Sequence, residues 1–295
     1  MSSLRRAILL PFLVLTCVVS AHAATVDLGS GVWVDDASGS IIAGVPGQRL
    51  IALDQADGVL RWAYRGVARP VLMTANEVIA FENAGRTGRL RLVSLKKDSG
   101  ERVARNTTRL PRGVLASADL DLSSRFEMRP HPKFPTSRLV WVFSPAATDA
   151  SGTRALPQSG VLNIDPATAR AGALDESPPT HRVRSARLTI PFAGTTEPAF
   201  FSADRQHVIV SRRARDATGF EWDLYDRDAR RLGRVKALVA YAPFVVRDDL
   251  LIALHASAAG WRAKENGAPV LRVLDWRRGG LRWEHHFATG AAAKK

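Results

Sequence analysis

The fold is decided by residues 49–62, which read RLIALDQADGVLRW. Apolar residues recur at alternate positions up to Leu53, as in a β-strand with one buried face. Asp54 can accept hydrogen bonds from the backbone of a tight turn, and Gly58 can adopt the left-handed conformation that reverses the chain. A second strand then reaches Trp62, whose ring can cover a large apolar area. The stretch therefore predicts a β-hairpin followed by an aromatic contact.

The same pattern returns near the other end of the chain, where residues 271–283 read LRVLDWRRGGLRW. Asp275, Gly279 and Trp283 keep the spacing of the first copy, with Gly four residues and Trp eight residues after the Asp. Three weaker copies lie between these two, and their Asp position is occupied by Lys96, Asp165 and Asp226. A hairpin that recurs in this way indicates a repeat architecture.

Two further strand-like runs precede each hairpin, so each unit is expected to have four antiparallel strands. In the third unit these runs are residues 113–122 and 138–143. Five four-stranded units predict an all-β fold, a β-propeller of about five blades. A β-sandwich is the structural alternative, but it gives no reason to repeat a four-stranded unit five times. The expected domain is 24–290, with blades at about 25–68, 69–108, 109–180, 181–237 and 238–290.

The hairpin motif resembles the blade motif of the PQQ-type, or quinoprotein-like, propeller repeats. That family motif reads Ala-x-Asp-x-x-Thr-Gly-x-x-x-Trp, and its Trp docks against the neighbouring blade. The family includes quinone-dependent alcohol dehydrogenases and the lipoprotein that scaffolds outer-membrane barrel assembly, and both usually have more blades than this chain can build. The quinone site of the dehydrogenases also needs Ca²⁺ ligands and, in several members, adjacent cysteines. We therefore expect a non-catalytic member that holds no cofactor.

Residues 1–23 have the features of a secretory signal peptide. Arg5 and Arg6 precede an apolar run at residues 7–20, and a small-x-small sequence ends at Ala23. Cleavage there removes Cys17, the only cysteine, so the mature chain can form no disulfide and no thiolate metal site. The sequence predicts a periplasmic or secreted protein with a short basic tail at residues 291–295.

The chain carries a net charge of +14, and removal of the signal leaves it strongly basic. Arginine makes up most of the cations, which either reflects genome composition or serves attraction to a polyanion. On the predicted strands, nearly all of the positive excess falls on the face that holds the second-to-third strand loops and the links between blades. We expect this face to bind an envelope protein or an anionic surface such as lipid headgroups or a cell-wall polymer, and no genomic nucleic acid. Its candidate binding residues are Arg105, Arg109, Arg112, Arg182, Arg184, Arg187, Arg212, Arg213 and Arg215.

Residues for catalysis or metal binding are sparse. Asp35-Asp36 and Asp248-Asp249 are the visible carboxylate pairs, and both fall where Asp suits a turn. Asp119 is the one acidic residue expected to face the centre of the ring. The alternative function, a carbohydrate-active hydrolase, needs two carboxylates there. Neighbouring His285 and His286 would point to opposite faces of a strand, so the sequence predicts no metal site and no catalytic residue.

Overall fold

The computed structural model describes residues 25–29, 31–44, 49–66, 68–82, 88–116, 125–144, 157–179, 198–215, 219–255 and 270–287. This part of the chain contains twenty-one β-strands and no helix. The strands form five antiparallel sheets, and in every sheet neighbouring strands follow one another in chain order. Five successive meanders of this kind are the blades of a β-propeller, so the predicted fold class is confirmed.

The first sheet consists of β1 (Thr25–Asp27), β2 (Val32–Asp35), β3 (Ser40–Gly44), β4 (Leu50–Asp54) and β5 (Leu60–Tyr64). The second consists of β6 (Ala68–Met73), β7 (Glu77–Glu82), β8 (Arg89–Lys96) and β9 (Arg102–Arg109). The third consists of β10 (Arg125–His131), β11 (Phe134–Ser144), β12 (Gln158–Asp165) and β13 (Arg170–Leu174). The fourth consists of β14 (Ala199–Phe201), β15 (Val208–Arg213), β16 (Phe220–Tyr225) and β17 (Arg231–Ala237). The fifth consists of β18 (Phe244–Arg247), β19 (Leu250–His255), β20 (Val270–Asp275) and β21 (Gly280–His286).

Two expected features of these sheets were wrong. The first sheet has five strands rather than four, because the three-residue strand β1 pairs with β2. A run this short shows no alternation that could predict it. The third sheet begins with β10, not with a strand at 113–122, because Phe126 and Met128 supply the apolar face. Within the predicted strand, Val114 and Ala116 are buried in the same cluster, but residues 113–116 are not part of a blade strand. Residues 117–122 lie outside the described part.

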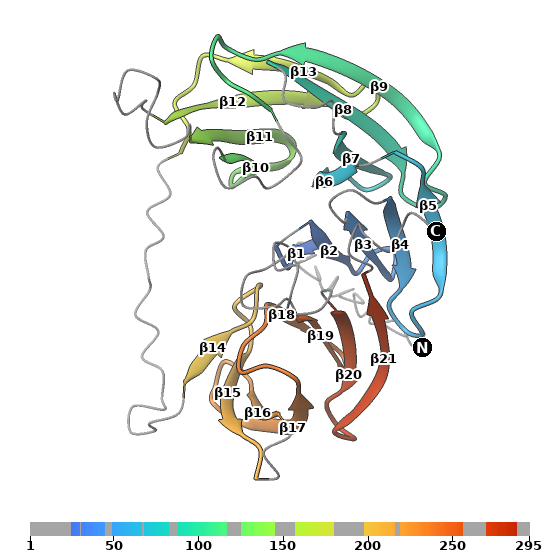
Figure 1. Cartoon of the computed structure of the whole chain (residues 1–295), viewed down its shortest axis with the longest axis vertical. Coiled ribbons are helices and arrows are strands. Elements are labelled where there is room, and N and C mark those ends of the chain that lie inside the picture. Colours follow the sequence, from blue (N-terminus) through green and yellow to red (C-terminus); the bar gives the residue numbers. More distant parts are fainter. Residues whose placement is uncertain are drawn as a thin grey trace, which may run out of the picture.

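Four apolar clusters join the five sheets into an arc in the order fourth, fifth, first, second, third (Figure 1). Trp222 of the fourth sheet packs with Phe244 of the fifth, and Val273 of the fifth packs with Ile41 of the first. A similar cluster joins the first sheet to the second, and another joins the second to the third. Each shared cluster buries one face of two sheets, which is the main stabilising contribution to the arc.

We call the side with the turns β2–β3, β4–β5 and their counterparts in the other sheets the turn face. The opposite side is the loop face. It holds the links between sheets and the loops β3–β4, β7–β8 and their counterparts in the other sheets. Antiparallel meanders place these two kinds of connection on opposite sides of a propeller.

The predicted hairpin motif has the expected geometry in the first and fifth sheets. Asp54 accepts a hydrogen bond from the Ala56 backbone nitrogen at 2.7 Å, and Asp275 accepts one from that of Arg278 at 2.9 Å. Gly58 and Gly279 have φ values of +75° and +71°, in the left-handed region. Each hairpin is therefore closed by a carboxylate and a glycine, as the spacing predicted.

The two motif tryptophans dock on the next turn of the arc. The indole nitrogen of Trp62 donates a 2.8 Å hydrogen bond to the carbonyl of Lys97 in the second sheet, and its ring lies on Gly100. Trp283 donates a 3.0 Å hydrogen bond to the carbonyl of Gln55 in the first sheet, and its ring lies on Gly58. A β-carbon on Gly58 would lie 2.7 Å from the Trp283 ring, so only glycine fits beneath the indole.

Truncation of a docked indole should loosen the arc. Trp62 is 6% exposed, so Trp62→Ala is expected to lower the free energy of unfolding by about 3–5 kcal/mol, because it leaves a cavity and an unpaired carbonyl. Leu60→Ala, two residues away at a side chain that is 55% exposed, is the matched control and should change it by less than about 0.5 kcal/mol. Urea denaturation monitored by far-UV circular dichroism, which reports on the backbone, measures both values. Equal effects of the two substitutions would contradict the docking role of Trp62.

Candidate functional site

The candidate site lies at the centre of the arc, around strand β1 (Figure 1). Strand β1 pairs with the inner edge of β2, with Thr25 opposite Asp35 and Asp27 opposite Trp33. Since β2 corresponds to the first strand of the four-stranded sheets, β1 is an additional strand on the side of the sheet nearest the centre. Charged residues from the first, second, fourth and fifth sheets meet on its two sides.

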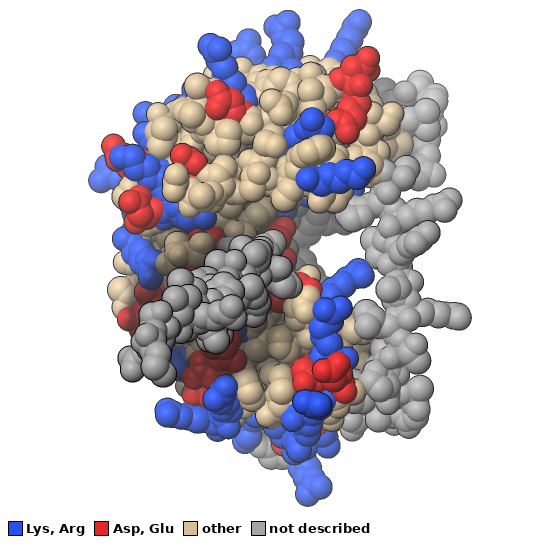
Figure 2. Space-filling view, turned by 180° about the vertical axis from the view of Figure 1, so that it is seen from behind, with Lys and Arg blue, Asp and Glu red and all other residues tan. Residues whose placement is uncertain are grey.

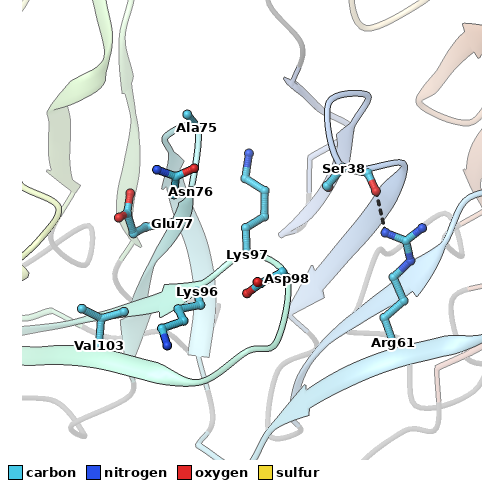
Figure 3. A pocket seen from close by; sticks show the side chains of 9 residues that line it. All are labelled: Ser38, Arg61, Ala75, Asn76, Glu77, Lys96, Lys97, Asp98 and Val103. Atoms are coloured by element: carbon cyan, nitrogen blue, oxygen red, sulfur yellow. Dashed lines mark hydrogen bonds between the residues drawn. The ribbon is translucent and has the colours of Figure 1, made fainter.

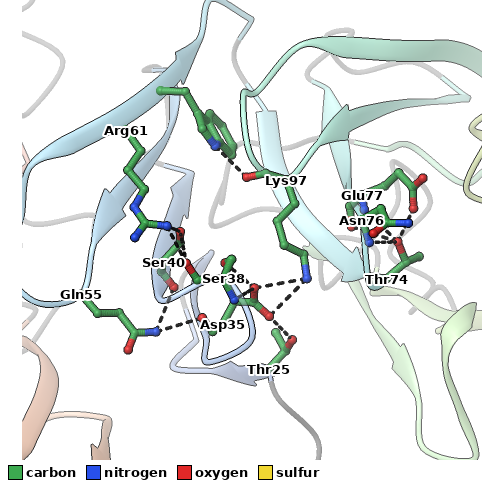
Figure 4. A network of polar contacts seen from close by, with 11 residues as sticks. Thr25, Asp35, Ser38, Ser40, Gln55, Arg61, Thr74, Asn76, Glu77 and Lys97 are labelled. Carbon is green, nitrogen blue, oxygen red and sulfur yellow. Dashed lines mark hydrogen bonds and ion pairs between the residues drawn. The ribbon is translucent and has the colours of Figure 1, made fainter.

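A buried ion pair lies on one side of β1 and joins the first and second sheets. The Lys97 ammonium is 3.2 Å from both carboxylate oxygens of Asp35, and their side chains are 6% and 0% exposed (Figure 4). Asp35 also accepts hydrogen bonds from the Thr25 hydroxyl at 2.9 Å and from the backbone nitrogen and hydroxyl of Ser38. The carboxylate thus has partners for both oxygens, which offsets the cost of removing it from water.

A second ion cluster lies on the other side of β1 and joins three sheets. Arg247 of the fifth sheet donates from Nε to Asp36 of the first sheet at 2.6 Å and from Nη1 to Asp204 of the fourth at 2.7 Å. Burial raises the pKa of Asp36, and Asp35 and Asp204 add to this, although Arg247 acts in the opposite direction. Burial alone would also raise the pKa of Asp204, but hydrogen bonds from Ser202 and Arg247 hold it below its usual value.

Three adjoining cavities open around these ion pairs. The outer one, about 660 Å³, lies between turns of the first and second sheets and is walled by Lys97, Asn76 and Arg61 (Figure 3). The inner one, about 490 Å³, shares Ala75 and Lys97 with it and is also lined by Trp33 and Met73. The third, about 750 Å³, shares Thr25 and Asp27 with the inner cavity and contains the Arg247 cluster. Together they form a chain of cavities from the rim to the centre.

Asp27 is the carboxylate of the central region without an ion pair among the described residues. One of its oxygens accepts a 2.7 Å hydrogen bond from the Gly29 backbone nitrogen. The Asp27 side chain is exposed to the cavities. The protein around it nevertheless removes part of the water that would stabilise the charged carboxylate, and this desolvation raises the pKa of Asp27. Asp35, Asp36 and Asp204 are all bound to cations, so among the described residues the centre offers one carboxylate without an ion pair, whereas a glycosidase uses two carboxylates. Asp119, the sequence-based candidate for the centre, lies outside the described residues.

The carboxylate pairs expected at turns do lie there. Asp35 and Asp36 end β2 and begin its turn, and Asp248 begins the turn after β18 with a φ of +50°. The inter-sheet ion pairs of Asp35 and Asp36 were not predicted, because their partners Lys97 and Arg247 lie 62 and 211 residues away in the chain and no local pattern connects them. Within the described ranges no group of three or more His, Cys, Asp or Glu side chains is arranged to hold a metal ion.

The predicted basic residues are divided by the structure into three groups. Strands β9 and β15 extend further than predicted, so Arg105 and Arg212 lie within them and Arg109 and Arg213 are their last residues. Arg105 pairs with the nearly buried Glu82, and Arg212 pairs with the buried Asp223. Arg182, Arg184 and Arg187 lie outside the described residues. The remaining four are exposed on the loop face and have no ion pair within the described part of the chain: Arg109, Arg112, Arg213 and Arg215.

A buried histidine lies between the fourth and fifth sheets. His255 is 4% exposed, its ring centroid is 5.5 Å from that of Trp222, and neither ring nitrogen has a hydrogen-bond partner among the described residues. Burial, followed by the positive charge of Arg272, lowers the pKa of His255 to about 4. His285 and His286 lie on opposite faces of β21, where His285 contacts Phe287 and His286 contacts Glu284.

The comparisons with known proteins give no close relative. No known family model matches the chain, and the search of curated proteins found no match. Among solved structures, BamB from Moraxella catarrhalis is 15% identical over 86% of this chain and 63% of that chain, with a TM-score of 0.25. The quinohemoprotein alcohol dehydrogenase ADHIIG from Pseudomonas putida HK5 is 12% identical over 85% of this chain and 58% of that chain, with a TM-score of 0.24. The Pan2 WD40 domain of Neurospora crassa is 13% identical over 85% and 63%, with a TM-score of 0.30.

The chain thus spans less than two thirds of the length of these three solved chains. At such TM-scores the assignment to the propeller fold depends on the five observed sheets. In the portion of the chain that the structure describes, no helix is long and apolar enough to cross a membrane.

The buried ion pair should be more important for stability than its exposed neighbour. Lys97→Met leaves Asp35 charged and buried, so it is expected to lower the free energy of unfolding by about 3–5 kcal/mol. Lys96 pairs with Glu101 in solvent, so the control Lys96→Met should have a much smaller effect on stability than Lys97→Met. Equilibrium urea denaturation of the two variants provides the comparison, and similar losses would refute the proposed importance of the inter-sheet pair.

His255 should make stability depend on pH in the acid range. Its pKa falls from 6.5 to about 4 on folding, so the unfolded chain binds a proton that the folded chain excludes. The stability that the chain keeps while His255 is neutral is fully present above pH 6.5. As the pH falls towards 4, the free energy of unfolding should decrease by roughly 3 kcal/mol at most. In His255→Gln this part of the pH dependence should disappear from urea denaturation curves, whereas the exposed-site control His286→Gln should keep it. An unchanged pH dependence in His255→Gln would show that this residue is not its source.

Proposed function

We propose that the protein is a non-catalytic binding module of the cell envelope or the exterior, and that its loop face docks on an anionic surface. Four exposed arginines carry this proposal: Arg109 ends β9 and Arg112 follows it, and Arg213 ends β15 and Arg215 follows it. A guanidinium group suits phosphate because its planar fork can donate two parallel hydrogen bonds.

The pairing of charges supports the loop face over the turn face. On the turn face, carboxylates neutralise many of the cations: Asp54 pairs with Arg61, Glu101 with Lys96, and Asp275 with Arg278. The four loop-face arginines have no such partners within the described residues. Figure 2 shows one side of the molecule, on which Lys and Arg lie mostly around the periphery with Asp and Glu between them. The proposal therefore depends on unpaired arginines at particular positions and not on one continuous basic surface.

The ion pairs of the central carboxylates favour a binding function over a hydrolase function. Asp36 and Asp204 share Arg247, and Asp35 is held by Lys97. A carboxylate fixed in this way stabilises contacts between sheets and is not available as nucleophile or base. Within the described part of the chain, the alternative of a carbohydrate-active hydrolase would have Asp27 as its one unpaired central carboxylate.

Vesicle binding tests the proposal. The mature protein should cosediment with phosphatidylglycerol vesicles, and binding should fall steeply between about 0.05 M and about 0.5 M salt, because salt screens exposed charges. Replacement of Arg109, Arg112, Arg213 and Arg215 by Gln should weaken binding at low salt by about tenfold or more.

The matched control removes the same charge from the turn face by replacing Lys133, Arg205, Arg230 and Arg277 with Gln. It should retain most of the vesicle binding, since the docking face is intact. Equal losses in the two quadruple variants would show that only net charge matters. Binding that is no stronger at low salt than at high salt would refute electrostatic docking itself, and selective retention of an acidic protein would replace the lipid surface as the partner.

A further inference from the structure

The fourth sheet carries charges on a face that is apolar in the first three sheets; in the fifth sheet the equivalent residue is Arg272. Trp222 and Leu224 of β16 pack towards the fifth sheet, so Asp223 between them points the opposite way. Asp223 lies three residues before Asp226 of the hairpin motif. The equivalent residues of the first three sheets are Ile51, Val93 and Leu162, which all pack in apolar clusters between sheets. Since the fourth sheet begins the arc, the Asp223 face lies at the end of the arc.

Three arginines converge on this one carboxylate. Arg231 donates to Asp223 from Nη2 at 2.6 Å and from Nε at 3.1 Å, and Arg234 donates from Nε at 2.8 Å. Arg212 pairs with the other carboxylate oxygen. The three arginines come from β15 and β17, the strands on either side of Asp223 in β16. The pleat of the sheet therefore fixes the direction from which each one arrives.

The cluster has more positive charge than its own carboxylates neutralise. Asp223 is 0% exposed, and the second nearby carboxylate, Glu221, contacts Arg234 Nη1 at 3.2 Å. Among the described residues, three guanidinium groups thus face two carboxylates, with Lys236 opposite Glu221 on the next strand.

The arginines remain accessible. The side chains of Arg212, Arg231 and Arg234 are 36%, 50% and 40% exposed, although Asp223 beneath them is not. The Arg212 Nε is buried and has no hydrogen-bond partner within the described part of the chain. An unpaired buried donor is costly, so an acceptor placed here would be favoured. A buried carboxylate that holds several guanidinium groups in fixed directions leaves their outer N–H groups available to another oxyanion.

We propose that this face of the fourth sheet binds a phosphoryl group between Arg212, Arg231 and Arg234. Asp223 is the positioning residue, because it orients the three guanidinium groups without touching the ligand. The excess positive charge attracts a phosphate dianion, and the planar forks bind its oxygens in pairs. This site goes beyond the proposed function, since it is a single place on the fourth sheet and includes none of the four loop-face arginines.

Isothermal titration calorimetry of the mature protein at low salt tests the proposal with three probes: inorganic phosphate, monomeric short-chain phosphatidic acid, and acetate. Binding of inorganic phosphate supports a site for any phosphoryl group. Binding of phosphatidic acid alone supports a lipid phosphate as the natural source. Acetate should bind at least about tenfold more weakly than the phosphoryl probe, because it carries less charge and fewer acceptor oxygens. No binding of either phosphoryl probe, or equal binding of acetate, would overturn the proposal.

Variants separate a built site from general attraction. Arg231→Gln leaves two arginines on Asp223 and should weaken phosphoryl binding by about tenfold while far-UV circular dichroism and Tm stay close to wild type. Arg231→Lys keeps the charge without the fork and should bind more weakly than wild type. The control Arg230→Gln removes an equal charge from the adjoining turn and should bind normally. If Arg231→Lys binds as tightly as wild type, or Arg230→Gln loses as much as Arg231→Gln, the site is not built from these forks.

The loop-face quadruple variant of the vesicle experiment should still bind the soluble phosphoryl probe, because its substitutions lie outside the cluster. Loss of vesicle binding with retained phosphoryl binding would leave both proposals standing. Retained vesicle binding in that variant would refute the loop-face proposal alone.

Discussion

The arc depends on one recurring contact, an indole ring laid on a glycine turn of the next sheet. A four-stranded sheet has two faces and can be stable only if neighbours cover them. The turn glycine lets the ring approach the backbone, and the indole nitrogen then satisfies a turn carbonyl. Trp283 makes this contact with Gln55, 228 residues away in the chain, and so joins the last sheet to the first.

Other residues make the equivalent contact where the tryptophan is missing. Ala104 of the second sheet packs in the cluster that contains Ala169, and Ala169 adopts the left-handed φ of +54° at the position of the glycine. Between the fourth and fifth sheets, Trp276 comes from the turn and lies against Gly233. The same junction between sheets is therefore made with several residue types. This variety is the physical reason why the middle copies of the motif look degenerate in sequence.

Charges are arranged around this apolar framework according to their partners. At the centre, Lys97 and Arg247 bind carboxylates of other sheets, so these charges stabilise the arc and leave Asp27 open to the cavities. On the loop face, four arginines have no ion pair among the described residues, and the proposed docking on an anionic surface depends on them. On the fourth sheet, Asp223 holds three arginines at the place where the first three sheets bury apolar side chains. Buried carboxylates thus decide which of the many cations are structural and which remain available for binding.

The sequence predicted what depends on local pattern. The hairpin motif predicted the turns, the docked tryptophans and the repeated sheets, because Asp, Gly and Trp act within a dozen residues of one another. It did not predict β1, which is too short to show alternation, or β10, where Pro130 and neighbouring charges conceal two apolar residues. Lys97, Arg247 and Asp223 were missed because their roles depend on pairing between strands or sheets. An acidic residue at a normally apolar motif position was the signal that could have revealed Asp223.

A double-mutant cycle between Gly58 and Trp283 tests the central contact most directly. Gly58→Ala places a methyl group against the indole, and Trp283→Ala removes that indole. If the ring rests on this glycine, the cost of Gly58→Ala in urea denaturation should fall by more than about 1 kcal/mol when Trp283 is already alanine. The remaining cost should be that of the left-handed backbone alone. Strictly additive costs would contradict the contact on which the arrangement of the five sheets depends.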